Sequence, residues 1–246
     1  MTTLRHLRAY RFVTLDDAAA LRDAIHARAT ALELKGTVLV AAEGINLNLA
    51  GAAPELEEFI AWLRADARFA DLQAHYSEPI GGCSGGALGK PYQRLKVKLK
   101  REIIRMDRPA IRPAAGRAAA LAPQTLARWL AAGHDDAGRP LALLDTRNGF
   151  EVDAGRFAGA IDWRLARFGD FPAALAAHRA ELAGKTVVSY CTGGIRCEKA
   201  ALLLREEGIE AWQLDGGILG YFEAVGAAHF DGTCFVFDQR ETVAAR

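Results

Sequence analysis

Cysteine is scarce in this chain, and its few thiols are too widely spaced to form a disulfide framework. The 246 residues include four cysteines and no Cys-x-x-Cys pair. Disulfide-rich domains need a higher density of cysteine, and structural zinc sites need closely paired ligands. We therefore expect no metal site and a reduced compartment in which a thiol stays free to react. The four residues are Cys83, Cys191, Cys197 and Cys234.

Long apolar runs are absent as well. The N-terminal stretch MTTLRHLRAYRF lacks the apolar segment of a signal peptide. No apolar run reaches the roughly 18 residues that a membrane helix needs. These features predict a cytoplasmic protein with no membrane partner. Apolar residues still make up 51% of the chain, which suits one or two globular domains.

Charge is nearly balanced overall but unevenly distributed along the chain. Residues 1–122 hold 18 Lys and Arg against 13 acidic residues, whereas residues 123–246 hold 13 against 17. The stretch from Lys90 to Arg112 is the most basic. Its positive charges fit either a solvated edge strand, where lysines block aggregation, or a surface that follows an RNA backbone. The candidate RNA-binding residues are Lys90, Arg94, Lys96, Lys98 and Lys100.

The first half of the sequence predicts a strand–helix–strand–strand–helix–strand order. An Ala- and Leu-rich helix is expected over Ala18–Leu34, and a second helix from Pro54 through Leu72. Apolar and basic residues then alternate over Leu95–Lys100, as in a strand with one basic face. This order is typical of a ferredoxin-like α+β domain, which we place at residues 1–105. The Pro- and Ala-rich residues 106–122 are expected to form a linker.

The second half alternates strands and helices, which predicts an α/β domain with a parallel sheet flanked by helices at residues 123–240. The alternation is clearest around three short apolar strands. The expected strands are Leu141–Asp145, Thr186–Tyr190 and Ala211–Leu214, and the expected helices are Pro123–Ala132, Phe171–Leu182 and Cys197–Glu207.

A reactive cysteine is predicted where the strand Thr186–Tyr190 ends. Sites of open α/β sheets lie at the carboxyl ends of strands, and Cys191 directly follows this strand. Gly193 and Gly194 allow backbone N–H groups to converge on an anion, and the next helix adds its positive end. With Arg196 these groups favour a thiolate and lower the pKa of Cys191. The expected active-site loop is Thr192, Gly193, Gly194, Ile195 and Arg196.

Three other interpretations of this loop deserve comparison. A buried core cysteine would need neither the glycine pair nor the arginine. A phosphatase also places a thiolate in such a loop, but with five residues between Cys and Arg, and here four lie between Cys191 and Arg196. The same groups would stabilise a persulfide on Cys191, so sulfur transfer stays open. Cys197 either packs into the helix or resolves an oxidised Cys191 by forming a disulfide.

Several motifs occur together in one order along the chain. They are Ala42-Glu43-Gly44-Ile45-Asn46, Lys98-Leu99-Lys100-Arg101-Glu102-Ile103-Ile104, the segment from Cys191 to Ala200, and Phe235-Val236-Phe237-Asp238-Gln239-Arg240. Together they resemble the oxygen-dependent tRNA uridine(34) hydroxylase family, and residues 123–235 resemble a rhodanese domain. Members join a ferredoxin-like domain to a rhodanese-like domain.

The resemblance implies an oxidoreductase that hydroxylates carbon 5 of the wobble uridine, using dioxygen as cosubstrate. It maps the family's essential cysteine onto Cys191. The expected partner is tRNA, bound at its anticodon loop, with no obligate protein partner and no cofactor identifiable from the sequence. The alternatives are a rhodanese-type sulfurtransferase carrying a persulfide on Cys191, and a noncatalytic RNA-binding module.

Overall fold

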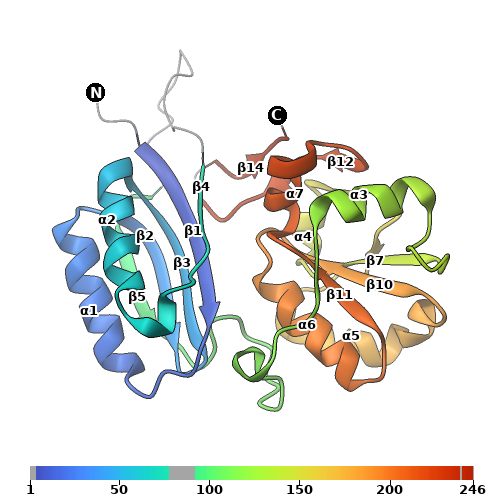
Figure 1. Ribbon diagram of the computed structural model, residues 1–246, viewed down its shortest axis with the longest axis horizontal. Coiled ribbons are helices and arrows are strands. Elements are labelled where there is room, and N and C mark those ends of the chain that lie inside the picture. Colours follow the sequence, from blue (N-terminus) through green and yellow to red (C-terminus); the bar gives the residue numbers. More distant parts are fainter. Residues whose placement is uncertain (1–3, 78–91, 239, 246) are drawn as a thin grey trace. The chain divides into compact units, whose positions relative to one another are not determined.

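The chain divides into two compact units, of which the first comprises Met1–Ile103 and Phe237–Arg240 and the second Ile104–Val236 and Glu241–Arg246. The computed structural model describes residues 4–77, 92–238 and 240–245 (Figure 1). Lys90 and Cys83 lie outside these ranges. In the part of the chain described, no helix is long and apolar enough to cross a membrane.

The first unit is a five-stranded sheet in the order β4-β1-β3-β2-β5. All neighbours are antiparallel except β2 and β5, and the first four strands with two helices give the expected ferredoxin-like order. The strand with alternating lysines adds a fifth, at the edge. The elements are β1 (Leu4–Phe12), α1 (Ala18–Ala31), β2 (Lys35–Ala41), β3 (Gly44–Ala52), α2 (Ala53–Arg64), β4 (Ala74–Tyr76) and β5 (Leu95–Leu99).

The second helix is shorter than the sequence pattern suggests. It ends at Arg64 rather than Leu72, and a separate 3₁₀ turn follows at Ala67–Phe69. The Asp66 side chain accepts the backbone N–H of Arg68 at 2.9 Å, a local bond that competes with helix continuation. Apolar Phe69 and Leu72 nevertheless remain in the core, which is why the apolar pattern continued past the helix.

Strand alternation in the first unit gives its sheet two different faces. Leu7, Val38 and Leu47 point toward α1 and α2 and are buried with them. Since successive strand residues point to opposite faces, the residues between them lie on the helix-free side. Figure 1 shows both helices on one side of this sheet.

The second unit is built on a five-stranded parallel sheet in the order β6-β11-β10-β7-β9. This confirms the predicted α/β class. Two short antiparallel pairs, β8 with β12 and β13 with β14, accompany the sheet. The elements are β6 (Ala120–Leu121), α3 (Pro123–Ala132), β7 (Leu141–Asp145), α4 (Gly149–Val152), β8 (Gly155–Phe157), β9 (Ile161–Asp162), α5 (Phe171–His178), β10 (Thr186–Tyr190), α6 (Ile195–Glu206), β11 (Ala211–Leu214), α7 (Gly217–Val225), β12 (Phe230–Gly232), β13 (Cys234–Phe235) and β14 (Thr242–Val243).

Helices cover both faces of this parallel sheet. Val187 of β10 is buried with residues of α5 and α6, whereas its neighbour Val188 is buried with residues of α3 and α7. The strand is therefore apolar on both sides, as parallel strands usually are. Phe157 packs edge-on against Tyr190 at a centroid distance of 4.9 Å, which fixes the end of β10 where Cys191 begins.

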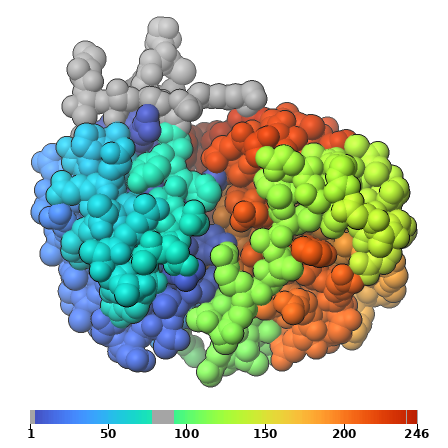
Figure 2. All heavy atoms as spheres, viewed as in Figure 1, coloured from blue at the N-terminus to red at the C-terminus, as the bar shows by residue number. Residues whose placement is uncertain are grey.

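The structure differs from the expected domain boundaries in two places. Residues 106–122 are part of the second unit rather than a linker, because Met106, Ile111 and Ala118 are buried in its core. The green segment leading into α3 lies directly on the second unit in Figure 2. Phe237–Arg240 belongs to the first unit instead of the second. Residues 106–122 resembled a linker because their prolines and alanines show no regular hydrophobic period, although one side chain in every few is buried.

Candidate active site

The cysteine loop lies at the carboxyl end of the central strand β10. All five residues of β10 are buried, and Cys191 follows directly. The helix α6 begins at Ile195, two residues earlier than the sequence suggested, with Gly194 as its N-cap at a φ of 103°. Few residues other than glycine adopt this left-handed conformation, so Gly194 lets the chain turn from strand to helix within four residues.

Cys191 is 1% exposed, and its sulfur is held among hydrogen-bond donors. The backbone N–H of Gly194 donates to Sγ at 3.1 Å, and the Cys197 Sγ lies 3.9 Å away. Burial raises the pKa of the Cys191 thiol, but the Cys197 thiol, the Arg196 charge and nearby backbone N–H groups lower it more. The resulting pKa is about 5, so the sulfur is a thiolate at neutral pH.

Arg196 is paired with a carboxylate that the sequence did not single out. Its two terminal nitrogens donate to Glu151 at 2.5 and 2.8 Å. Arg196 is 6% exposed and Glu151 is fully buried, and two such groups are stable together only with good geometry. The predicted fixed cation is therefore one half of a buried ion pair. A capping-box spacing, Asn148-x-x-Glu151, was the available signal in the sequence, since the Glu151 carboxylate also accepts the backbone N–H of Asn148.

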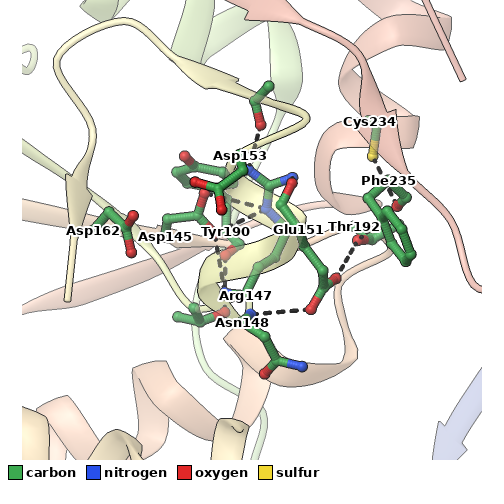
Figure 3. Close-up of polar contacts among 12 residues, drawn as sticks. Asp145, Arg147, Asn148, Glu151, Asp153, Asp162, Tyr190, Thr192, Cys234 and Phe235 are labelled. Carbon is green, nitrogen blue, oxygen red and sulfur yellow. Dashed lines mark hydrogen bonds and ion pairs between the residues drawn. The ribbon is translucent and has the colours of Figure 1, made fainter. Parts of the chain in front are cut away.

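A second buried ion pair holds the segment that carries Glu151. Arg147 and Asp145 are 0% and 1% exposed, and their charged groups approach to 2.6 Å. Arg147 also donates to the backbone carbonyls of Glu151 at 3.2 Å and Gly155 at 2.7 Å. Figure 3 shows Asp145, Arg147 and Glu151 as one connected group beside Thr192. Arg147 thus positions the backbone from which Glu151 reaches Arg196.

The N-terminus of α7 fixes the loop from the other side. The backbone N–H groups of Ile218 and Leu219 donate to the carbonyls of Cys191 and Thr192 at 2.9 and 3.1 Å. Gly217 has a φ of +62°, and a Cβ there would lie 2.5 Å from the Cys191 carbonyl oxygen. Only glycine combines this backbone conformation with so close an approach, so Gly217 is required here.

The remaining loop residues differ in exposure. Three of them, Thr192, Gly193 and Ile195, are partly exposed, whereas Gly194 is buried. Thr192 Oγ1 lies 3.4 Å from Glu151 Oε1 and 3.5 Å from the carbonyl oxygen of Phe235. The accessible surface of the loop is therefore formed by residues next to Cys191 rather than by its sulfur.

Cys197 is buried in the first turn of α6. Its Sγ lies 2.9 Å from the carbonyl oxygen of Gly194. Burial, with the neighbouring Cys191, raises the pKa of the Cys197 thiol well above its ordinary value. The two sulfurs therefore differ in ionisation, one a thiolate and the other a neutral thiol.

The candidate RNA-binding residues belong to the first unit, and Cys191 belongs to the second. Lys90 falls outside the described residues. The other four lie on the edge strand β5 or directly beside its ends, and all are exposed: Arg94, Lys96, Lys98 and Lys100.

A parallel α/β domain with a cysteine loop after its central strand is rhodanese-like. The family model described as "Rhodanese-like domain" matches residues 123–224, and the model described as "UPF0176 acylphosphatase like domain" matches residues 4–103. Among solved structures, a rhodanese-like domain protein from Staphylococcus aureus is 21% identical, covering 42% of this chain and 90% of its own, with a TM-score of 0.34.

Curated relatives match nearly the whole chain. A protein of Variovorax paradoxus named tRNA uridine(34) hydroxylase is 59% identical over 99% of this chain and 90% of its own length. A protein of the same name from Bordetella petrii is 58% identical over 98% of this chain and 92% of its own length. The chain belongs to the tRNA uridine(34) hydroxylase family.

The buried pair between Glu151 and Arg196 predicts strong energetic coupling. Glu151→Leu leaves the Arg196 charge buried alone, and Arg196→Met leaves the Glu151 charge buried alone. Each should lower the free energy of unfolding by about 3–5 kcal/mol. The double variant Glu151→Leu, Arg196→Met removes both charges. Its loss of unfolding free energy should be much smaller than the sum of the losses in the two single variants. Urea unfolding of the single and double variants measures this coupling. Additive losses would contradict it.

Proposed function

We propose that this chain hydroxylates carbon 5 of the uridine at position 34 of tRNA, with Cys191 as the catalytic nucleophile. The observation that carries the proposal is the thiolate of Cys191, whose pKa is about 5, at the end of β10. The relatives named tRNA uridine(34) hydroxylase, which match along nearly the whole chain, supply the reaction and the substrate. We infer that the protein acts in the cytoplasm on the anticodon loop, where the wobble base is already unpaired.

Carbon 5 of uracil is a poor nucleophile until the ring is activated. The Cys191 Sγ adds to carbon 6, and the ring electrons move to form an enolate in which carbon 5 is nucleophilic. Carbon 5 then takes one oxygen atom from an electrophilic species derived from dioxygen. Loss of the proton on carbon 5 and departure of Sγ from carbon 6 restore the double bond and release the free thiolate.

The net reaction fixes what else is consumed. One oxygen atom of dioxygen replaces the hydrogen of carbon 5 as a hydroxyl group, and the other leaves as water. Two protons and two electrons come from an external two-electron reductant. The thiolate must be regenerated in each cycle, and a low pKa suits this role because a weakly basic thiolate is a good leaving group.

Cys197 is proposed as the residue that resolves an oxidised Cys191. If oxidation converts Cys191 to a sulfenic acid, the Cys197 sulfur attacks it, an S–S bond forms and water leaves. The separation of 3.9 Å between the two sulfurs supports this pairing. An external thiol then reduces the disulfide and restores both cysteines.

The helix-free face of the first unit is proposed to bind the tRNA backbone. Neighbouring strands place polar residues in one row across this face, in register: Arg8 opposite Asn48, Asn48 opposite Thr37, and Thr37 opposite Lys96. Lys98 follows Lys96 by two residues, at the next position on the same face of β5, and lies opposite Leu39. A flat sheet face with polar and basic side chains suits a single-stranded RNA loop.

A charge reversal on this face tests the proposal. Lys96→Glu should weaken tRNA binding and flatten the dependence of affinity on salt, because fewer counterions are released. Arg22→Glu makes the same charge change on α1, on the other side of the sheet, and should have little effect. Affinities from gel shifts at several salt concentrations make the comparison. Equal weakening by both variants, or binding that ignores salt, would contradict an RNA-binding sheet face.

The hydroxylase itself is tested with tRNA from a strain lacking this protein. Wild-type protein, supplied in air, should restore nucleosides derived from 5-hydroxyuridine, detected by nucleoside mass spectrometry. Cys191→Ser should restore none, and neither should the wild type without oxygen. Cys234→Ser replaces a buried cysteine outside the loop and serves as the matched control, which should retain activity.

Two outcomes would replace the proposal. Thiosulfate:cyanide sulfurtransferase activity with unchanged tRNA nucleosides would assign the site to sulfur transfer through a persulfide. Full restoration by Cys191→Ser would leave only an RNA-binding role.

A further inference from the structure

An exposed aromatic ring lies beside the cysteine loop and is not used by the chemistry above. Phe150 is 50% exposed, although the residues on either side of it, Gly149 and Glu151, are buried. Glu151 is the carboxylate that holds Arg196. Because Phe150 is the chain neighbour of Glu151, the position of its backbone is fixed by the same contacts that hold Glu151.

A second ring joins it from a distant part of the chain. Phe235 of β13 lies with its ring centroid 5.2 Å from that of Phe150, at an interplanar angle of 88°. The Phe235 carbonyl oxygen lies 3.5 Å from Thr192 Oγ1, and Figure 3 shows Phe235 next to Thr192 and Glu151. Phe235 is therefore next to the loop through its carbonyl oxygen, and Phe150 is linked to the loop through its neighbour Glu151 and through the Phe235 ring.

The accessible surface around Cys191 then has a defined composition. Cys191 is 1% exposed, so a substrate first meets Thr192 and Gly193, which are partly exposed, and the Phe150 ring. A flat apolar ring near the residues that flank the cysteine loop suits a flat base.

We propose that Phe150 is a positioning residue that stacks on the target uracil and holds it beside the Cys191 loop, with Phe235 supporting the ring edge-on. The inference rests on the proposed function for the identity of the base. Proteins bind unpaired RNA bases by stacking them on aromatic side chains. Uracil offers little surface for other apolar contacts, so one well-placed ring contributes much of its orientation.

The test separates stacking from simple packing. Phe150→Leu keeps an apolar side chain against Phe235 but removes the flat π face, whereas Phe150→Tyr keeps it. Stacking is worth about 1–3 kcal/mol per base, so Phe150→Leu should lower kcat/KM for tRNA hydroxylation roughly 5- to 150-fold. Phe150→Tyr should stay near wild type. Phe237→Ala, a change at another exposed phenylalanine, 62% exposed, is the control.

Two further measurements exclude a structural effect and do not depend on turnover. The rate of Cys191 alkylation should be the same in wild type and Phe150→Leu, because the loop is intact. An anticodon stem-loop RNA with 2-aminopurine at position 34 should be quenched on binding wild type and Phe150→Tyr, but not Phe150→Leu.

The outcomes distinguish this inference from the proposed function. Hydroxylation by wild type with unchanged kcat/KM and quenching in Phe150→Leu would overturn the stacking role. Absence of quenching by wild type would overturn it as well. Quenching that depends on the aromatic ring, in a protein that does not hydroxylate tRNA, would sustain base stacking and overturn the hydroxylase.

Discussion

A guanidinium and a carboxylate buried together stabilise a fold only when each satisfies the other, and the Arg196–Glu151 pair meets this condition beside Cys191. Arg196 contributes positive charge to the thiolate. Glu151 keeps that charge in place, and Arg147 keeps the backbone of Glu151 in place. The low pKa of Cys191 therefore depends on a chain of contacts that runs from β7 through α4 to α6.

Backbone hydrogen bonds hold the cysteine loop alongside the side-chain ion pairs. The loop has its carbonyls bound by α7 and one of its N–H groups directed at the sulfur. Oriented amides of this kind are effective because they need no rearrangement when charge develops. A protein built this way carries its reactive group on a rigid sheet, while the aromatic and basic residues that we propose to meet RNA lie at the surface. In this proposal, chemistry and RNA recognition are assigned to different side chains.

Local pattern was sufficient to predict much of this architecture. The strands Leu141–Asp145, Thr186–Tyr190 and Ala211–Leu214 were predicted with their observed bounds, since short apolar runs between turn residues carry a strong signal. The Cys191 loop followed from its place after a strand and from its glycines. Family motifs supplied the expected reaction, which the residues alone could not.

Contacts between distant segments were not predictable. Glu151 lies 45 positions from Arg196, and nothing in its own neighbourhood signals that partner. The packing of Gly217 on the Cys191 carbonyl is not visible in the sequence either, because it depends on how α7 folds back. Residues 106–122 resembled a linker because irregular burial leaves no period. In each case tertiary packing, rather than local propensity, decides the outcome.

Direct titration of the active-site sulfur tests the central claim. The ultraviolet absorbance of the thiolate is recorded against pH for the wild type, and the curve of Cys191→Ser is subtracted. The difference should rise by one thiolate with a midpoint near pH 5 and be lost as the pH falls below it. A midpoint at about 8.5, the value of an ordinary cysteine, would contradict the account.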